Sequence, residues 1–205
     1  MSEHVNHTGV HRDDEAQKLG MWLFIFTELL LFGGLFLVYS IFRAQYPVAF
    51  RESSLELSVT IGVINTVILL VSSMSVAMAL TAVQKSNKKF ALQMLLLTLL
   101  LAGAFLVNKY FEWGAKFHHG LYPGSELMQL LDRGHHLYFS LYFFMTGLHA
   151  LHIIIGMILL IINYVKVSKG KVHSTNYMHL ENAALYWHLV DLIWIFLFPL
   201  MYLIS

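Results

Sequence analysis

The sequence contains no cysteine, only three prolines and few charged residues, which make up 12% of its 205 positions. Without cysteine the chain cannot form disulfides, thiolate metal sites, c-type haem attachments or the paired-thiolate copper centre of electron-transfer domains. Its formal net charge of +1 lacks the basic footprint of a nucleic-acid-binding protein, so we expect no nucleic-acid partner. Because 58% of the residues are hydrophobic, the composition favours a membrane protein over a soluble domain.

Five long apolar runs account for most of the chain. They cover residues 19–42, 57–84, 90–112, 134–165 and 182–204. Each is long enough for a transmembrane helix, which needs about 20 mostly apolar residues. We therefore predict an all-α, polytopic membrane protein whose residues 18–205 form one bundle of five transmembrane helices. Residues 1–17 are polar and lack a signal-peptide pattern, so we expect them to form a cytoplasmic tail.

The segments between the runs differ in length and composition. We expect a short loop at residues 43–56, where charged residues and Pro47 interrupt the apolar pattern. The third run is predicted to end near residues 109–113, because charges mixed with aromatic side chains are typical of a membrane interface. Residues 114–134 contain Pro123 and Gly124 and are predicted to form the longest loop, with room for a short interfacial helix.

The distribution of Lys and Arg predicts the orientation. Eight of these residues fall in the N-terminal tail and in the second and fourth connections, and five fall in the first and third. Since cytoplasmic loops hold the excess of positive residues, we predict the N-terminus inside and the C-terminus outside.

A few polar residues lie within the runs and are candidates for chemistry. Glu28 lies in the first run, where an ionised carboxylate is costly. It can exchange protons or pair with a partner, or it can be a neutral carboxyl hydrogen-bonded to a neighbouring helix. We expect it to face protein, either a partner subunit or the fourth or fifth run.

Two further pairs of polar residues each share a helix face, because their members are three positions apart. His149 and His152 form the pair in the fourth run, and His188 and Asp191 form the pair in the fifth. If the four groups meet between the two helices, they can pair with each other, bind a metal or ligate a haem. Structural pairing is favoured over a metal, and a haem pair is disfavoured because His149 and His188 should lie at different depths.

Three stretches carry a family resemblance: residues 20–32, 142–156 and 181–194. The second contains Thr-Gly-x-His-x-x-His and the third contains Tyr-Trp-His-x-Val-Asp-x-x-Trp. Together they resemble subunit III of the haem-copper oxidases, in its five-helix bacterial form. The resemblance implies a non-catalytic subunit of a proton-pumping terminal oxidase that reduces oxygen to water in the bacterial cytoplasmic membrane.

The same resemblance implies partners and site residues. The partners would be oxidase subunits I and II, with a small subunit IV or a larger respiratory supercomplex as further candidates. Haem and copper are expected in the partner subunits, whereas this chain should hold no cofactor and no catalytic residue. The acid that matches Glu28 reacts with carbodiimides in the family and supports proton uptake. The other family motif residues are Glu112, His149, His152, His188 and Asp191.

The resemblance leaves several alternatives open. Longer family members have two additional helices that form one wall of a lipid-holding cleft, so we expect bound phospholipid only where a neighbouring subunit supplies that wall. Cytochrome c oxidases and quinol oxidases share this subunit, and Glu28 slightly favours the cytochrome c branch. A nitric-oxide-reductase-associated homologue is another alternative.

Two alternatives come from other classes of protein. One is a haem-bearing membrane anchor of the cytochrome b type, with His149 or His152 and His188 as axial ligands. The other is an independent proton-coupled carrier built around Glu28 and Asp191. The visible spectrum of the chain and its transport activity when reconstituted alone would distinguish them from an accessory subunit.

Overall fold

The computed structural model describes residues 8–125, 128 and 130–203. Five helices within them are long and apolar enough to cross a membrane. They are α1 (Thr8–Gln45), α3 (Val59–Gln84), α4 (Lys88–His118), α6 (Arg133–Ser168) and α7 (Met178–Phe198). A short helix α2 (Pro47–Leu55) and a π-helical segment η1 (Pro199–Leu203) complete the described elements, none of which is a strand. The predicted all-α architecture with five membrane-spanning helices is confirmed.

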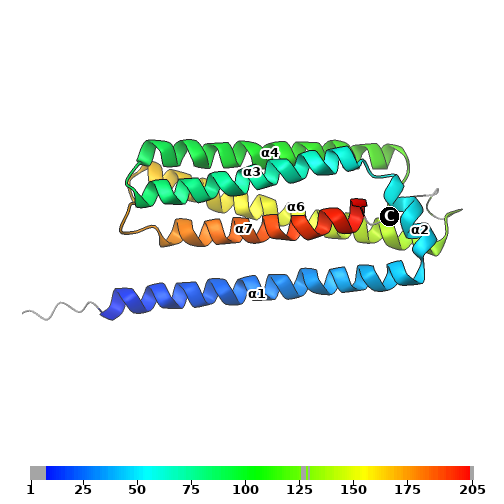
Figure 1. The fold of residues 1–205 in the computed structure, drawn as a ribbon, viewed down its shortest axis with the longest axis horizontal. Coiled ribbons are helices and arrows are strands. Elements are labelled where there is room, and N and C mark those ends of the chain that lie inside the picture. The colour runs from blue at the N-terminus through cyan, green and yellow to red at the C-terminus, as the bar shows by residue number, and fades with distance from the viewer. Residues whose placement is uncertain (1–7, 126–127, 129, 204–205) are drawn as a thin grey trace, which may run out of the picture.

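The long helices run alternately in opposite directions and form one bundle (Figure 1). The turns from α3 to α4 and from α6 to α7 lie at one end, and α2 lies at the other. Helix α1 packs along α6 and α7 at the side of the bundle. Only 6% of the most apolar window of α1 is buried, against 28 to 61% in the other four helices. Most of the apolar surface of α1 is therefore left uncovered by the described residues.

The helix boundaries differ from the predicted ones mainly between the first and second runs. The loop expected at residues 43–56 is wrong, because Pro47–Leu55 forms α2. Pro47 occupies its first turn, where a missing backbone N–H is tolerated. Phe50 and Ser54 are buried, and the amino group of Lys116 holds the end of α2 by donating to the carbonyl of Glu56. Helix α1 begins at Thr8, within the tail expected at residues 1–17. Residues 1–7 of that tail and residues 204–205 lie outside the described part of the chain.

The third apolar run also continues further than expected. Helix α4 extends to His118, beyond the end that we expected for this run near residues 109–113. Lys109 and Glu112 are 4% and 5% exposed and point into the bundle, whereas Tyr110 and Phe111 are on its surface. The helix continues because the two charges neutralise each other within the bundle.

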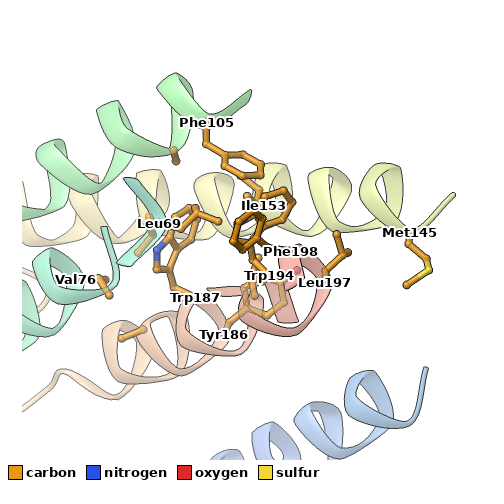
Figure 2. Close-up of a cluster of buried hydrophobic side chains, with 14 of the residues drawn as sticks. Leu69, Val76, Phe105, Met145, Ile153, Tyr186, Trp187, Trp194, Leu197 and Phe198 are labelled. Atoms are coloured by element: carbon orange, nitrogen blue, oxygen red, sulfur yellow. The ribbon is translucent and has the colours of Figure 1, made fainter. Parts of the chain in front are cut away.

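The core of the bundle consists of large aromatic side chains from α7 packed against the other helices (Figure 2). Trp187 and Trp194 are fully buried. Trp194 meets Phe105 of α4 edge to face, with ring centroids 4.9 Å apart. Trp187 fills the space opposite Gly156 of α6, where a Cβ atom would lie 2.8 Å from the indole. Apolar burial does not drive helix association in lipid, so such close contacts supply much of the packing energy.

Candidate functional site

Glu28 lies against a histidine of a neighbouring helix. Its Oε2 atom is 2.9 Å from Nε2 of His152, which joins α1 to α6. The other ring nitrogen, Nδ1, is 2.7 Å from the carbonyl oxygen of Leu148. A carbonyl can only accept, so Nδ1 carries a proton and donates it there.

Because Nδ1 already carries a proton, the proton shared by Glu28 and His152 has two possible positions. In one form, Nε2 is protonated and donates to the ionised carboxylate. In the other, the neutral carboxyl donates to the unprotonated Nε2. Both forms satisfy the same 2.9 Å contact, so a proton can pass between the two side chains without a change of rotamer.

Aromatic rings shield the pair on its bundle side. Phe32 meets the His152 ring edge to face at 5.4 Å, and Tyr186 stacks on that ring at 6.4 Å. The hydroxyl of Tyr186 also donates to the backbone carbonyl of His152, at 3.2 Å. The side chain of Glu28 remains 15% exposed, so the pair lies at the edge of the bundle and is reached from the side of α1.

His149 lies one turn of α6 away from His152 but in different surroundings. It is completely buried between Phe105, with ring centroids 5.6 Å apart, and Trp194, with centroids 5.1 Å apart. Neither of its ring nitrogens has a hydrogen-bond partner among the described residues. A buried histidine without a partner is unusual and is one of the unsatisfied polar groups of the bundle.

His188 and Asp191 of α7 face α3. Nδ1 of His188 is 2.6 Å from the hydroxyl oxygen of Ser73. Asp191 is 3% exposed and lies near the same serine. Its carboxylate oxygens make no hydrogen bond to the described residues. The two residues therefore lie at the contact between α7 and α3.

A second polar cluster lies in α4, α6 and η1, and Glu112 is its only member that the sequence analysis singled out. Nζ of Lys109 is 3.0 Å from Oε2 of Glu112, 3.2 Å from the hydroxyl of Tyr142 and 3.0 Å from that of Tyr202. Both tyrosines also donate to Oε1 of Glu112. The ammonium group lies 5.5 Å from the ring centroid of Trp194. Every charge in the cluster is paired, which offsets the cost of removing it from water.

A family model described as cytochrome c oxidase subunit III matches residues 2–205, nearly the whole chain. The chain belongs to this family. Relatives named for different oxidases resemble it to a similar degree. Cytochrome c oxidase subunit 3 of Thermostichus vulcanus is 30% identical over 98% of this chain and 92% of its own length. A probable quinol oxidase subunit 3 of Staphylococcus saprophyticus is 29% identical over 94% of this chain and 91% of its own length.

One relative is much longer than this subunit III chain. The haem-copper oxidase subunit I+III of Aeropyrum pernix is 34% identical over 91% of this chain. The match covers only 22% of that protein. This chain therefore spans about a fifth of the fused relative and corresponds to one part of it.

The structure separates the polar motif residues of this subunit III chain. The four groups His149, His152, His188 and Asp191 do not meet between two helices, because the histidines face different neighbours. His152 contacts α1, His149 packs among aromatic rings, and His188 contacts α3. Within the described ranges, no group of three or more His, Asp or Glu residues has the geometry of a metal site. This arrangement does not fit axial ligation of a haem between α6 and α7, which needs two facing histidines.

Proposed function

We propose that this chain is subunit III of a proton-pumping haem-copper terminal oxidase, a cytochrome c oxidase, in the bacterial cytoplasmic membrane. It binds subunit I, with subunit II also in the complex, and carries no redox centre of its own. Its role is to stabilise subunit I and to support proton uptake during oxygen reduction. The observation that carries the proposal is the Glu28 and His152 pair, a proton-exchanging group between α1 and α6.

The position of this pair supports a role in proton uptake. A carboxyl and an imidazole in contact can accept a proton from one side and release it on the other, because both protonation patterns keep the same hydrogen bond. Glu28 retains partial exposure on the helix that the chain covers least. The pair can therefore exchange protons with groups outside the bundle, including those of a neighbouring subunit.

Subunit I is the partner that the comparisons favour. The relative from Aeropyrum pernix is named subunit I+III, and a fusion keeps two parts of one complex together. The apolar outer side of α1, which includes Trp22, Phe26 and Leu30, is suited to lipid or to a membrane-embedded neighbour. Bound phospholipid on this side would require that neighbour to provide the second wall.

A quinol oxidase is the second candidate, favoured by the name of the Staphylococcus saprophyticus relative. The electron donor binds to other subunits, so the two candidates are distinguished by assaying the purified complex rather than this chain. Purified complex that oxidises reduced cytochrome c but not quinol would support the first candidate, and the reverse result would support the second.

Two experiments test the function. Extraction in mild detergent with a tag on this chain should recover a haem- and copper-bearing partner, while the separated chain should show no haem absorbance. A haem that stays with the isolated chain would instead support the cytochrome b alternative. Deletion of the chain should leave oxygen reduction initially active but make the oxidase inactivate faster during turnover or pump less. Loss of haem from subunit I after deletion would contradict a role limited to proton uptake and stability.

A further inference from the structure

Asp191 is a buried carboxyl group that takes no part in the Glu28 and His152 pair. It lies on α7, which packs against α3 along the bundle (Figure 1). Asp191 is 3% exposed, and neither of its carboxyl oxygens has a hydrogen-bond partner among the described residues. An ionised carboxylate without a partner is costly inside a membrane bundle. The group therefore favours a bound proton, which needs a route to and from the carboxyl.

The hydroxyl group of Ser73 in α3 provides the first step of such a route. Asp191 lies near this serine, and the Ser73 hydroxyl oxygen is 2.6 Å from Nδ1 of His188. A neutral histidine exists as two tautomers, so Nδ1 can either accept the hydroxyl proton or donate to the hydroxyl oxygen. A hydroxyl both donates and accepts. Once the carboxyl turns toward it, Ser73 can pass a proton in either direction.

The second ring nitrogen of His188 opens to the outside of the bundle. His188 is half-buried, and its Nε2 atom is not enclosed and makes no hydrogen bond to the described part of the chain. It lies near the middle of the span Met178–Leu203, where lipid offers no hydrogen-bonding group. Nε2 is therefore the atom at which a polar side chain of a membrane-embedded neighbouring subunit can exchange a proton with this chain.

Asp191 has no counter-ion within the described ranges. Helix α3 contains no charged residue between Val59 and Gln84, and Asp191 forms no ion pair. The other buried Lys, Glu and His side chains are Lys109, Glu112, Lys116, His149 and His152. All of these except His149 are hydrogen-bonded, His152 to Glu28 of α1, and His149 packs between aromatic rings. Uptake of a proton is thus the available way to remove the charge of Asp191.

We propose that Asp191, Ser73 and His188 form a proton relay that stores one proton on Asp191 and exchanges it at Nε2 of His188. In the empty state, Nδ1–H of His188 donates to Ser73, and the hydroxyl proton points at the Asp191 carboxylate. When a proton binds at Nε2, the Nδ1 proton passes to the serine oxygen and the hydroxyl proton passes to the carboxylate. The chain then holds one additional proton, Nε2 is a donor and Asp191 is a neutral acid. The reverse sequence releases the proton.

The test follows the carboxyl group of Asp191 by infrared difference spectroscopy of the purified complex. We expect Asp191→Asn to remove a protonated-carboxyl band that the parent complex shows at neutral pH. In heavy water this band shifts as a deuteron replaces the proton, and the rate of the shift measures exchange. Ser73→Ala and His188→Phe should slow it at least about tenfold, because each removes a positioned proton-transfer group. Asp191→Glu keeps the acid but moves its band, and assigns the signal if the asparagine variant does not assemble.

Matched variants make the result specific to the relay. Ser73→Thr keeps the hydroxyl and should exchange at close to the parent rate. Ser75→Ala removes a hydroxyl of the same helix that is hydrogen-bonded to α4 and should leave the rate unchanged. Glu28→Gln should also leave it unchanged, which separates this result from the test of the proton-uptake role. Parent-like exchange in both Ser73→Ala and His188→Phe would overturn the proposal, as would a parent complex without an Asp191 carboxyl band.

Discussion

At the scale of single residues, the Glu28 and His152 pair can be tested without disturbing the fold. Glu28→Gln keeps the shape of the side chain and a hydrogen bond to Nε2 of His152 but removes the exchangeable proton. We expect the variant to assemble normally, to lose carbodiimide labelling and to complete several-fold fewer turnovers before inactivation. The number of turnovers is measured from oxygen consumption by the purified complex.

A matched control for this variant is Glu181→Gln. Glu181 lies half-buried in the first turn of α7 and is not among the hydrogen-bond partners of His152 in the described part of the chain. Its replacement should leave labelling of Glu28 and turnover endurance unchanged. If Glu28→Gln also leaves endurance unchanged, the pair has only a structural role and the proton-uptake proposal fails.

The Lys109 and Glu112 pair makes a different prediction, about stability. Glu112→Gln leaves a buried ammonium group without its counter-charge, which should lower the free energy of unfolding by about 3 to 5 kcal/mol. Replacing both residues, as in Lys109→Met/Glu112→Gln, removes both charges and should recover much of that loss. Denaturation of the four proteins of this double-mutant cycle measures the coupling. Additive losses would show that the two charges do not stabilise each other.

At the scale of helices, the closest contact between α6 and α7 depends on a glycine. A Cβ atom at position 156 would lie 2.8 Å from Trp187 and 3.2 Å from Tyr186. Trp187 cannot easily move, because it is fully buried and its indole N–H donates to Ser72. We therefore expect Gly156→Ala to destabilise the protein by about 1 to 3 kcal/mol, as overpacking does.

The control for this contact is Gly103→Ala in α4, where nothing lies within 4 Å of the added Cβ atom. Alanine favours a helix over glycine by about 1 kcal/mol, so this variant should be neutral or slightly stabilised. Thermal unfolding of the two variants in the same detergent makes the comparison. If both variants are equally stable, α6 and α7 can move apart without a loss of stability.

The helices also show what sequence patterns can and cannot predict. Long apolar runs predicted all five spans, because only a helix satisfies the backbone of such a run in lipid. The helix α2 was missed because Pro47 was read as an interruption, although a proline in the first turn supports a helix. Lys109 and Glu112 were read as interfacial charges, since a sequence does not reveal that tyrosines from α6 and η1 surround them.

The same limit applies to the candidate site. Spacing predicted that His149 and His152 share a face of α6, but it did not predict which helices that face meets. We predicted that Glu28 faces either a partner subunit or the fourth or fifth apolar run. It contacts α6, which contains the fourth run. The partner of His188 was not foreseen, because Ser73 in α3 is an ordinary residue of an apolar run. Such pairings depend on the packing of helices far apart in the sequence.

At the scale of the whole molecule, the bundle has two ends of different charge, and these predict its orientation. Eight Lys and Arg residues belong to the tail and to the turns beside α3 and α6 at one end. Five were assigned to the other end from the sequence, but Lys109 and Lys116 are buried side chains of α4 and are not loop charges. Three remain there, so the positive-inside rule favours a cytoplasmic N-terminus more strongly than the sequence count did.

The absence of cysteine makes this orientation directly testable. We expect Lys85→Cys and Lys171→Cys, at the end where α3 meets α4 and α6 meets α7, to react with a membrane-impermeant maleimide only after intact cells are permeabilised. Leu130 lies at the α2 end of the bundle and is 85% exposed, so Leu130→Cys should react in intact cells. The reversed pattern would place the N-terminus outside. The Glu28 and His152 pair would then keep its contact but lie closer to the other membrane surface, and proton uptake from the cytoplasm would need a different route.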